Sequence, residues 1–236
     1  MPNNTPNAEI NRRIRLTFNH ILYNYFDLFR LPGLDNKVVN KLVTVEGWEN
    51  IEAALAKGKG IVMASAHLGN IETVLYAMLL RGLKITIPVE RVEPPELFDY
   101  ITTLRSSKGL NLIPVDGPLL GMIRTLKKGG VAGIAGDRDI NNTGRVTQFF
   151  NHSARLPDGH IKLALKTGAP LVMGFSHRNP DHTYHAYFLP AYQPLQTGTE
   201  EQRVDAGMQY IIQEIEHAIR QNPEQWTLTV SIWADN

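Results

Sequence analysis

The sequence of 236 residues contains no cysteine, which excludes disulfides and thiolate metal sites and is consistent with a reducing compartment. No apolar run approaches the roughly 20 residues that a membrane-spanning helix needs. Residues 1–8 lack the charged-then-apolar pattern of a secretory signal and are expected to be disordered. The formal net charge is only +1, so bulk charge predicts no nucleic-acid partner.

Several catalytic motifs are also missing. There is no Gly-x-Ser-x-Gly nucleophile elbow and no His-Glu-x-x-His zinc motif. The glycines between residues 129 and 136 have the wrong spacing for a dinucleotide fingerprint or a phosphate loop. Ser65 lies two residues before His67 and on a strand would share its face, but no other residue supports a Ser–His nucleophile. The histidines after residue 150 are scattered, and we expect surface or core residues there instead of metal ligands.

The length suits one large domain with a sizeable core. Apolar residues make up 43% and charged residues 20% of the chain, as is usual for a folded globular protein. Predicted helices alternate with predicted strands, and no internal repeat is present. This order predicts an α/β fold: a single-domain α/β sandwich whose central, largely parallel or mixed sheet is flanked by helices.

Apolar periodicity and turn residues place the expected elements. Helices are predicted over residues 9–30, 71–81, 94–108, 118–128, 157–166 and 200–221, and another ends at residue 55. Extended segments are predicted over residues 38–46, 83–89, 110–115, 131–135, 171–176 and 184–189, after Gly60, and in the tail up to Trp233.

The first predicted helix has a wide apolar face rich in aromatic residues. Such a face with cationic flanks is typical of a helix that lies in a membrane interface, but an amphipathic helix packed on its own core has the same pattern. Composition does not decide between the two. The face comprises Ile10, Ile14, Phe18, Ile21, Leu22, Tyr25, Phe26 and Phe29, and the flanking cations are Arg12, Arg13, Arg15 and Arg30.

The most informative stretch is the predicted strand-to-helix junction that contains His67, Gly69, Asn70 and Glu72. Such a junction presents free backbone N–H groups and the positive end of a helix dipole. On one continuous helix the side chains of His67 and Glu72 would diverge by about 140°. They can cooperate only if His67 precedes the helix and Glu72 is in its first turn, as a general base oriented by a carboxylate. Taken alone, the spacing is common by chance and also fits a strand end and a helix start.

Other charged residues follow predicted strands, where α/β sheets place their sites. Asp137, Arg138 and Asp139 come directly after residues 131–135 and form either a salt-bridged corner or part of a pocket. Arg91 follows another strand, and Arg105 lies on the next helix. Either arginine could bind a phosphate or carboxylate, although a lone arginine is more often on a solvated surface.

The block from Ala66 to Glu72 resembles the His-x4-Asp/Glu signature of the glycerolipid (lysophospholipid) acyltransferase superfamily. It is most similar to the branch of bacterial lipid A late (lauroyl/myristoyl) acyltransferases and phosphatidylinositol mannoside acyltransferases. Ile71 stands where tryptophan is usual. The region before residue 45 is shorter than is typical and lacks a hydrophobic anchor helix, so we expect the helix of residues 9–30 to attach to the membrane. Further similar segments follow in the family's order: Arg105, residues 109–114, 135–139, 149–150, 156–169 and 223–226.

The resemblance implies an enzyme that moves a fatty acyl group from acyl-CoA or acyl carrier protein (acyl-ACP) to a hydroxyl of a membrane glycolipid or lysophospholipid. No metal and no cofactor besides the acyl donor is implied. The oxyanion would be bound by backbone N–H groups near Gly69 or by Arg105. The implied catalytic residues are His67 as general base, Glu72 as its orienting carboxylate and Asp137 as an acidic residue that supports His67 or the acceptor. The implied substrate-binding residues are Asn70, Arg91, Arg105, Arg138 and Asp139.

We expect residues 1–32 to form a lead and an interfacial helix, and residues 33–236 to form the acyltransferase domain. The expected location is peripheral, on the cytoplasmic face of the plasma (inner) membrane. Two alternatives remain: a thioesterase or lipase-type hydrolase that uses the same dyad on water, and a non-catalytic lipid-binding protein. The intact set of polar residues disfavours the second.

Overall fold

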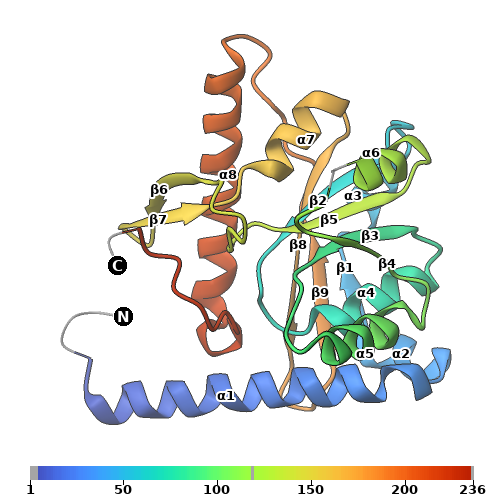
Figure 1. Cartoon of the computed structure of the whole chain (residues 1–236), viewed down its shortest axis with the longest axis vertical. Coiled ribbons are helices and arrows are strands. Elements are labelled where there is room, and N and C mark those ends of the chain that lie inside the picture. The colour runs from blue at the N-terminus through green and yellow to red at the C-terminus, as the bar shows by residue number, and fades with distance from the viewer. Residues whose placement is uncertain (1–4, 118–119, 235–236) are drawn as a thin grey trace.

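The computed structural model describes residues 5–117 and 120–234, and it has the predicted α/β class (Figure 1). A sheet of seven strands has the order β1-β9-β8-β2-β5-β3-β4. The strands are β1 (Val43–Glu46), β2 (Ile61–Ser65), β3 (Ile85–Val89), β4 (Asn111–Pro114), β5 (Val131–Ala135), β8 (Leu171–Arg178) and β9 (Tyr184–Phe188). The helices are α1 (Asn7–Arg30), α2 (Asn36–Leu42), α3 (Trp48–Leu55), α4 (Ile71–Leu80), α5 (Pro95–Ser106), α6 (Leu120–Lys127), α7 (Gly159–Thr167) and α8 (Glu200–Gln221), with short 3-10 turns η1 (Leu31–Gly33) and η2 (Pro223–Gln225).

The central strand β2 is parallel to both of its neighbours, β5 and β8. A strand in this position is covered on both faces, so its sequence is apolar as far as Ala64, and only the terminal Ser65 is polar. Val62 and Ala64 face one hydrophobic cluster, which includes residues of α6, α7 and α8. Ile61 and Met63 face the other cluster, which includes residues of α2, α3 and α4. The alternation along β2 therefore separates the two layers of helices.

The sheet is mixed at one end only. Strand β9 runs antiparallel to β8, and β1 is parallel to β9. A separate antiparallel hairpin, β6 (Arg145–Phe149) and β7 (His152–Leu156), lies apart from the sheet beside α8 (Figure 1). The C-terminal tail runs back to this hairpin, where Trp233 forms an antiparallel bridge with Ala154.

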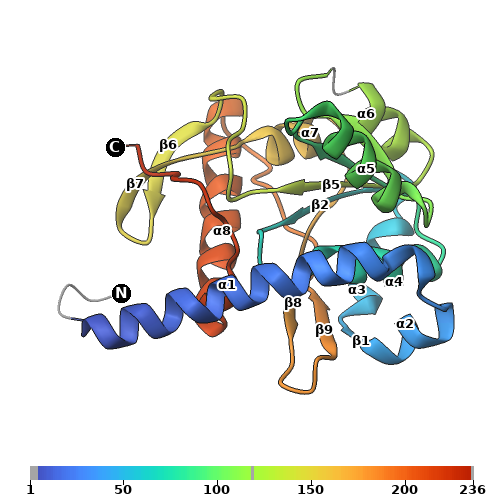
Figure 2. The ribbon, with the colours of Figure 1, turned by 60° about the horizontal axis from the view of Figure 1, so that its bottom comes forward.

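The first helix lies across the molecule on its outer side (Figure 2). Its contacts with the rest of the chain are mainly to η2, α4 and α5. Most of its predicted apolar face is solvent-exposed, including Phe18 (61%), Leu22 (66%) and Phe26 (60%). None of the helices in the described ranges is long and apolar enough to cross a bilayer. The core-packing alternative for this face is therefore wrong for most of its residues.

Polar contacts nevertheless tie α1 firmly to the body. Asp27 is completely buried and accepts hydrogen bonds from Arg178 of β8, Tyr184 of β9 and Asn70. Arg30 forms an ion pair with the other carboxylate oxygen of Asp27 at 2.7 Å. Removal of one partner of such a buried ionic group typically costs about 3–5 kcal/mol. The helix is thus an integral part of the fold that also presents an apolar surface.

Two expectations about secondary structure need correction. Residues 38–46 are not extended throughout: α2 occupies Asn36–Leu42, and only Val43–Glu46 is a strand. The helix begins because Asp35 accepts a hydrogen bond from the N–H of Lys37 at 2.6 Å, which caps its first turn. The second strand of the hairpin, β7, was not predicted. Residues 118–119 of the predicted helix 118–128 lie outside the described residues.

Gly69 is required where the chain turns from β2 into α4. Its φ of +69° is in the left-handed region, and a Cβ atom there would lie 2.3 Å from the carbonyl oxygen of Ser176 in β8. Gly58 has nearly the same φ, +70°, but open space around the corresponding position. Alanine substitutions at Gly58 and Gly69 therefore separate the cost of the backbone conformation from the cost of the close approach to Ser176.

We expect Gly58→Ala to lower the free energy of unfolding by about 1–2 kcal/mol, the cost of a left-handed residue with a Cβ. Gly69→Ala should cost about 1–3 kcal/mol more, because the loop or β8 must move. Chemical denaturation of both variants measures the difference. Equal losses would show that the close approach to Ser176 does not constrain the loop.

Candidate active site

The site is built at the carboxyl edge of two adjacent parallel strands. Ser65 at the end of β2 is in register with Ala135 at the end of β5, and the N–H of Gly136 donates to the carbonyl of Ser65 at 2.7 Å. The loops that follow both strands therefore begin side by side. This places His67 and Asp137, which are 70 residues apart in sequence, in direct contact.

His67 and Asp137 share two hydrogen bonds. The imidazole Nδ1 lies 2.8 Å from Oδ1 of Asp137, and the backbone N–H of His67 donates to Oδ2 at 2.8 Å. Because an ionised carboxylate only accepts, Nδ1 carries the proton and Nε2 keeps its lone pair. The His67 side chain is 40% exposed while that of Asp137 is fully buried. The arrangement is a surface imidazole held in one tautomer by a buried carboxylate.

The two groups shift each other's pKa in opposite directions. Desolvation disfavours the imidazolium, but the charge and hydrogen bond of Asp137 outweigh it and raise the pKa of His67. Burial favours protonated Asp137, but the charge of His67 and the hydrogen bonds that Asp137 accepts lower the pKa of this carboxyl. Arg138 and Arg105 also act on His67, and their positive charges limit the rise. Asp137 is therefore ionised beside an imidazole of enhanced basicity.

Glu72 does not hold His67, contrary to the predicted dyad. Its Oε1 accepts a hydrogen bond from Nε of Arg105 at 2.8 Å and forms an ion pair with Nη2 at 2.6 Å. Glu72 lies in the first turn of α4 and is buried, whereas Arg105 reaches it from the last turn of α5. The spacing of four residues brings Glu72 to the site, but the partner of the imidazole comes from the adjacent strand. The role of Glu72 is to fix the Arg105 guanidinium.

Two of the predicted substrate-binding residues are structural. Asn70 is only 1% exposed; its amide oxygen caps α4 through Thr73, and its amide nitrogen donates to Asp27 at 2.6 Å. Asp139 accepts from the N–H of Gly144 at 2.7 Å and closes the turn after β5. Neither side chain is directed to a substrate by these contacts.

Of the predicted arginines, Arg105 and Arg138 lie close enough to His67 to act on its charge, whereas the contacts of Arg91 are with other residues. Arg138 pairs with Glu90 at 2.6 Å and retains partial exposure. Arg91 is more exposed, lies 3.5 Å from Asp116 and packs over the ring of Phe98.

Part of the expected backbone oxyanion site near Gly69 is already occupied by hydrogen bonds within the protein. The N–H of His67 donates to Asp137, that of Leu68 to Ala66 at 2.7 Å, and that of Gly69 to Gln225 at 3.0 Å. Ser65 donates its hydroxyl proton to the Ala66 carbonyl at 3.4 Å. The N–H groups of residues 67–69 and the Ser65 hydroxyl are therefore not free to stabilise an oxyanion.

Sequence reasoning assigned no role to two groups that support the loop. The indole N–H of Trp226 donates to Oδ2 of Asp137 at 2.9 Å. The amide of Asn24, on α1, donates to the carbonyl of Gly69 at 2.9 Å. Trp226 lies in residues 223–226, one of the segments that resemble the acyltransferase family, so the sequence did contain a signal for it. No sequence feature pointed to Asn24.

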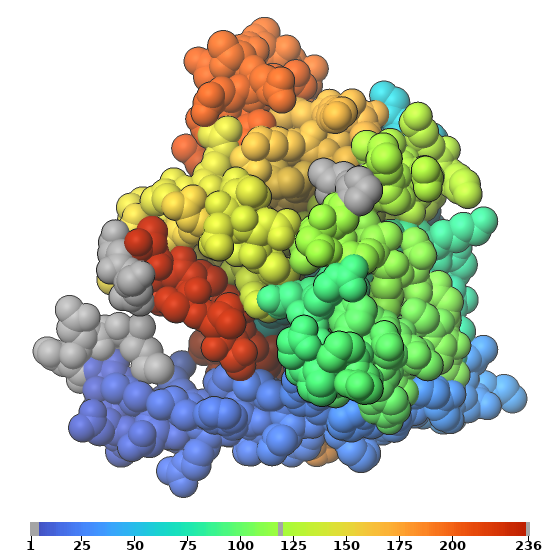
Figure 3. Space-filling model, viewed as in Figure 1, coloured from blue at the N-terminus to red at the C-terminus, as the bar shows by residue number. Residues whose placement is uncertain are grey.

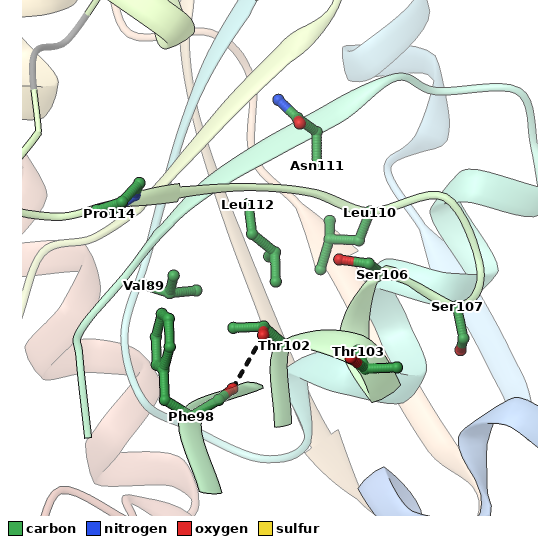
Figure 4. A pocket seen from close by; sticks show the side chains of 10 residues that line it. All are labelled: Val89, Phe98, Thr102, Thr103, Ser106, Ser107, Leu110, Asn111, Leu112 and Pro114. Atoms are coloured by element: carbon green, nitrogen blue, oxygen red, sulfur yellow. Dashed lines mark hydrogen bonds between the residues drawn. The ribbon is translucent and has the colours of Figure 1, made fainter. Parts of the chain in front are cut away.

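A cavity of about 710 Å³ lies between α5 and the strands β3 and β4 (Figure 4). Its wall combines apolar side chains with the hydroxyls of Thr102, Thr103, Ser106 and Ser107. None of the predicted site residues lines it, so cavity volume alone would not have identified His67.

These features define an α/β protein that presents a carboxylate-oriented histidine at the carboxyl edge of a mostly parallel sheet, bordered by arginines. The family model of the bacterial lipid A biosynthesis acyltransferases matches residues 2–234. The chain belongs to this family.

Individual proteins are also similar to this chain. A phosphatidylinositol mannoside acyltransferase of Mycobacterium tuberculosis is 30% identical over 152 residues, which cover 62% of this chain and 48% of that protein. Its counterpart from Mycolicibacterium smegmatis is 28% identical over 149 residues, covering 61% and 49%. The chain thus spans about half the length of these relatives. The 1-acyl-sn-glycerophosphate acyltransferase PlsC of Thermotoga maritima aligns with a TM-score of 0.47 and 16% identity, over 89% of this chain and 97% of that one.

The pKa shifts predict how activity depends on pH. If His67 acts as a base, it must be neutral, so the acid limb of kcat/KM should have its midpoint above the ordinary imidazole value of about 6.5. Asp137→Asn should move this limb to lower pH, because the charge that raises the pKa of His67 is lost. A pH–rate profile for both proteins tests this; an unchanged limb in the variant would contradict the pairing.

Proposed function

We propose that the protein transfers a fatty acyl group from a thioester donor, acyl-CoA or acyl-ACP, to a hydroxyl of a membrane glycolipid or lysophospholipid. The observation that carries the proposal is the partly exposed imidazole of His67, whose Nδ1 is bound by the buried Asp137 and whose Nε2 is left to act as a base. Membership of an acyltransferase family supports it. The names of the curated relatives favour a glycolipid acceptor.

In the proposed reaction, His67 is the general base. Nε2 takes the proton of the acceptor hydroxyl while its oxygen attacks the thioester carbonyl, and a new C–O bond forms. The tetrahedral intermediate then collapses, the C–S bond breaks, and the imidazolium returns the proton to the thiolate leaving group. Asp137 holds the tautomer and stabilises the imidazolium. The proposed reaction uses no metal and no cofactor besides the acyl donor.

Arg105 and Arg138 are the groups we assign to the developing negative charge. Both guanidinium groups act electrostatically on His67, and Arg105 is fixed by a hydrogen bond and an ion pair to Glu72. A preorganised cation close to a developing oxyanion needs no reorganisation during the reaction. The same guanidinium groups, with Arg91, suit the phosphates of a CoA, an acyl carrier protein or a lipid.

We also propose that α1 holds the protein peripherally on the cytoplasmic face of the plasma membrane. Burial of its exposed apolar face contributes about 25 cal/mol per Å². Each arginine near an anionic leaflet adds about 1 kcal/mol, and Arg12, Arg13 and Arg15 lie in the N-terminal half of α1. The reacting lipids would then be reached from the membrane surface.

His67→Ala should reduce acyl transfer by about 10²–10⁴-fold, the usual loss for a general base. The assay follows an isotopically labelled long-chain acyl-CoA into vesicles that contain a mannosylated phosphatidylinositol, a lipid A precursor or lysophosphatidic acid. His217→Ala, an exposed histidine on α8, is the matched control. Thioester cleavage without transfer to any of the acceptors would favour the hydrolase alternative.

The membrane proposal predicts that replacement of Phe18, Leu22 and Phe26 together by serine abolishes co-sedimentation with anionic vesicles. Binding of the unaltered chain should weaken as salt rises. Point substitutions are needed because deletion of α1 would leave Arg178 without Asp27. The control replaces three exposed residues elsewhere, Val146, Leu195 and Val230, by serine. Equal sedimentation of both triple variants would contradict the role of α1.

A further inference from the structure

The C-terminal segment after α8 pairs with the loop that carries His67. Leu68 and Trp226 form an antiparallel bridge. Gly69 donates to the carbonyl of Gln225 at 3.0 Å, and the N–H of Thr227 donates to the carbonyl of His67 at 2.9 Å. Residues 225–227 are therefore held in register against residues 67–69. Figure 3 shows this end of the chain lying against neighbouring segments on the molecular surface.

This register directs the Trp226 indole at Asp137. Its Nε1–H donates to Oδ2 at 2.9 Å, the oxygen that also accepts from the backbone of His67. Two donors thus occupy Oδ2, and Oδ1 is left to the imidazole. The indole is itself fixed between aromatic rings, with centroid separations of 5.9 Å to Phe149 and 6.3 Å to Phe150.

We propose that Trp226 is a positioning residue for the catalytic pair: its indole N–H and its aromatic packing keep the Asp137 carboxylate turned so that Oδ1 faces Nδ1 of His67. The inference rests on the proposed role of His67 as general base. Trp226 touches neither substrate nor reacting atoms. Loss of the N–H would leave Oδ2 one donor short, and the carboxylate could rotate away from the imidazole.

The chain provides a matched comparison. Trp233 packs on the same Phe149 at 6.2 Å, but it is not among the groups that bond to Asp137 in the described structure. Trp226→Phe and Trp233→Phe both retain an aromatic ring and remove an indole. Only the first removes a donor from Asp137.

We expect Trp226→Phe to lower kcat by about 10- to 100-fold with little change in KM, as small misplacements of a catalytic group do. The acid limb of kcat/KM should move to lower pH, because a loosened Asp137 no longer raises the pKa of His67. The other charges that face His67, Arg138 and Arg105 with their partners Glu90 and Glu72, are unchanged. Trp233→Phe should leave both the rate and the limb close to those of the unaltered protein.

Several outcomes overturn the inference. One is a Trp226→Phe variant with the same kcat and pH profile as Trp233→Phe. The others are a loss of rate without any shift of the acid limb of kcat/KM, and a shift of that limb to higher pH. Failure of the proposed function is distinguishable, since His67→Ala would then retain activity.

A measurement without Trp226→Phe covers the case in which that variant fails to fold. The chain has three tryptophans, so Trp48→Phe and Trp233→Phe assign two of the indole N–H resonances and leave the third to Trp226. That resonance should titrate with the midpoint of His67 and lose this titration in His67→Ala. A Trp226 resonance that does not respond as His67 titrates would overturn the proposal.

Discussion

The buried carboxylate of Asp137 is the group on which the site depends. It accepts from the imidazole, from the backbone of His67 and from the indole of Trp226, and these contacts join β2, β5 and the C-terminal segment. An ionised carboxylate without such donors would be costly to bury. The same bonds that allow its burial fix the tautomer of His67. One set of contacts therefore both stabilises the buried charge of Asp137 and orients the imidazole of His67.

A second buried carboxylate, Asp27, holds α1 against the rest of the protein. It binds Arg178, Tyr184 and Asn70, while Asn70 caps the helix that follows the His67 loop. Asn24 adds a bond to Gly69 from the same helix. The helix with the exposed apolar surface is consequently in polar contact with the loop that carries His67. The surface of α1 and this loop form one connected unit.

Local signals in the sequence were sufficient for the fold class and for the strand–loop–helix unit around His67. They failed where a local preference competes with a cap: Val38 and Val39 favour a strand, but Asp35 starts a helix there. They failed again for the partner of His67, because four-residue spacing is visible in sequence and the adjacency of β2 and β5 is not. The Asp27 contacts to Arg178 and Tyr184 span more than 150 residues, and no periodicity reports such pairs.

The pairing of Glu72 with Arg105 changes how the electrostatics of the site are understood. The amide N–H groups of residues 67–69 are already used, and in the proposed mechanism the guanidinium groups of Arg105 and Arg138 stabilise the oxyanion. Two cations near an imidazole lower its pKa and would weaken it as a base. Asp137 opposes them from a fully buried position, where its charge is little screened by solvent, and the net effect on the pKa of His67 is a rise. A deeply buried carboxylate therefore allows a histidine of raised pKa and two arginines to occupy the same edge of the sheet.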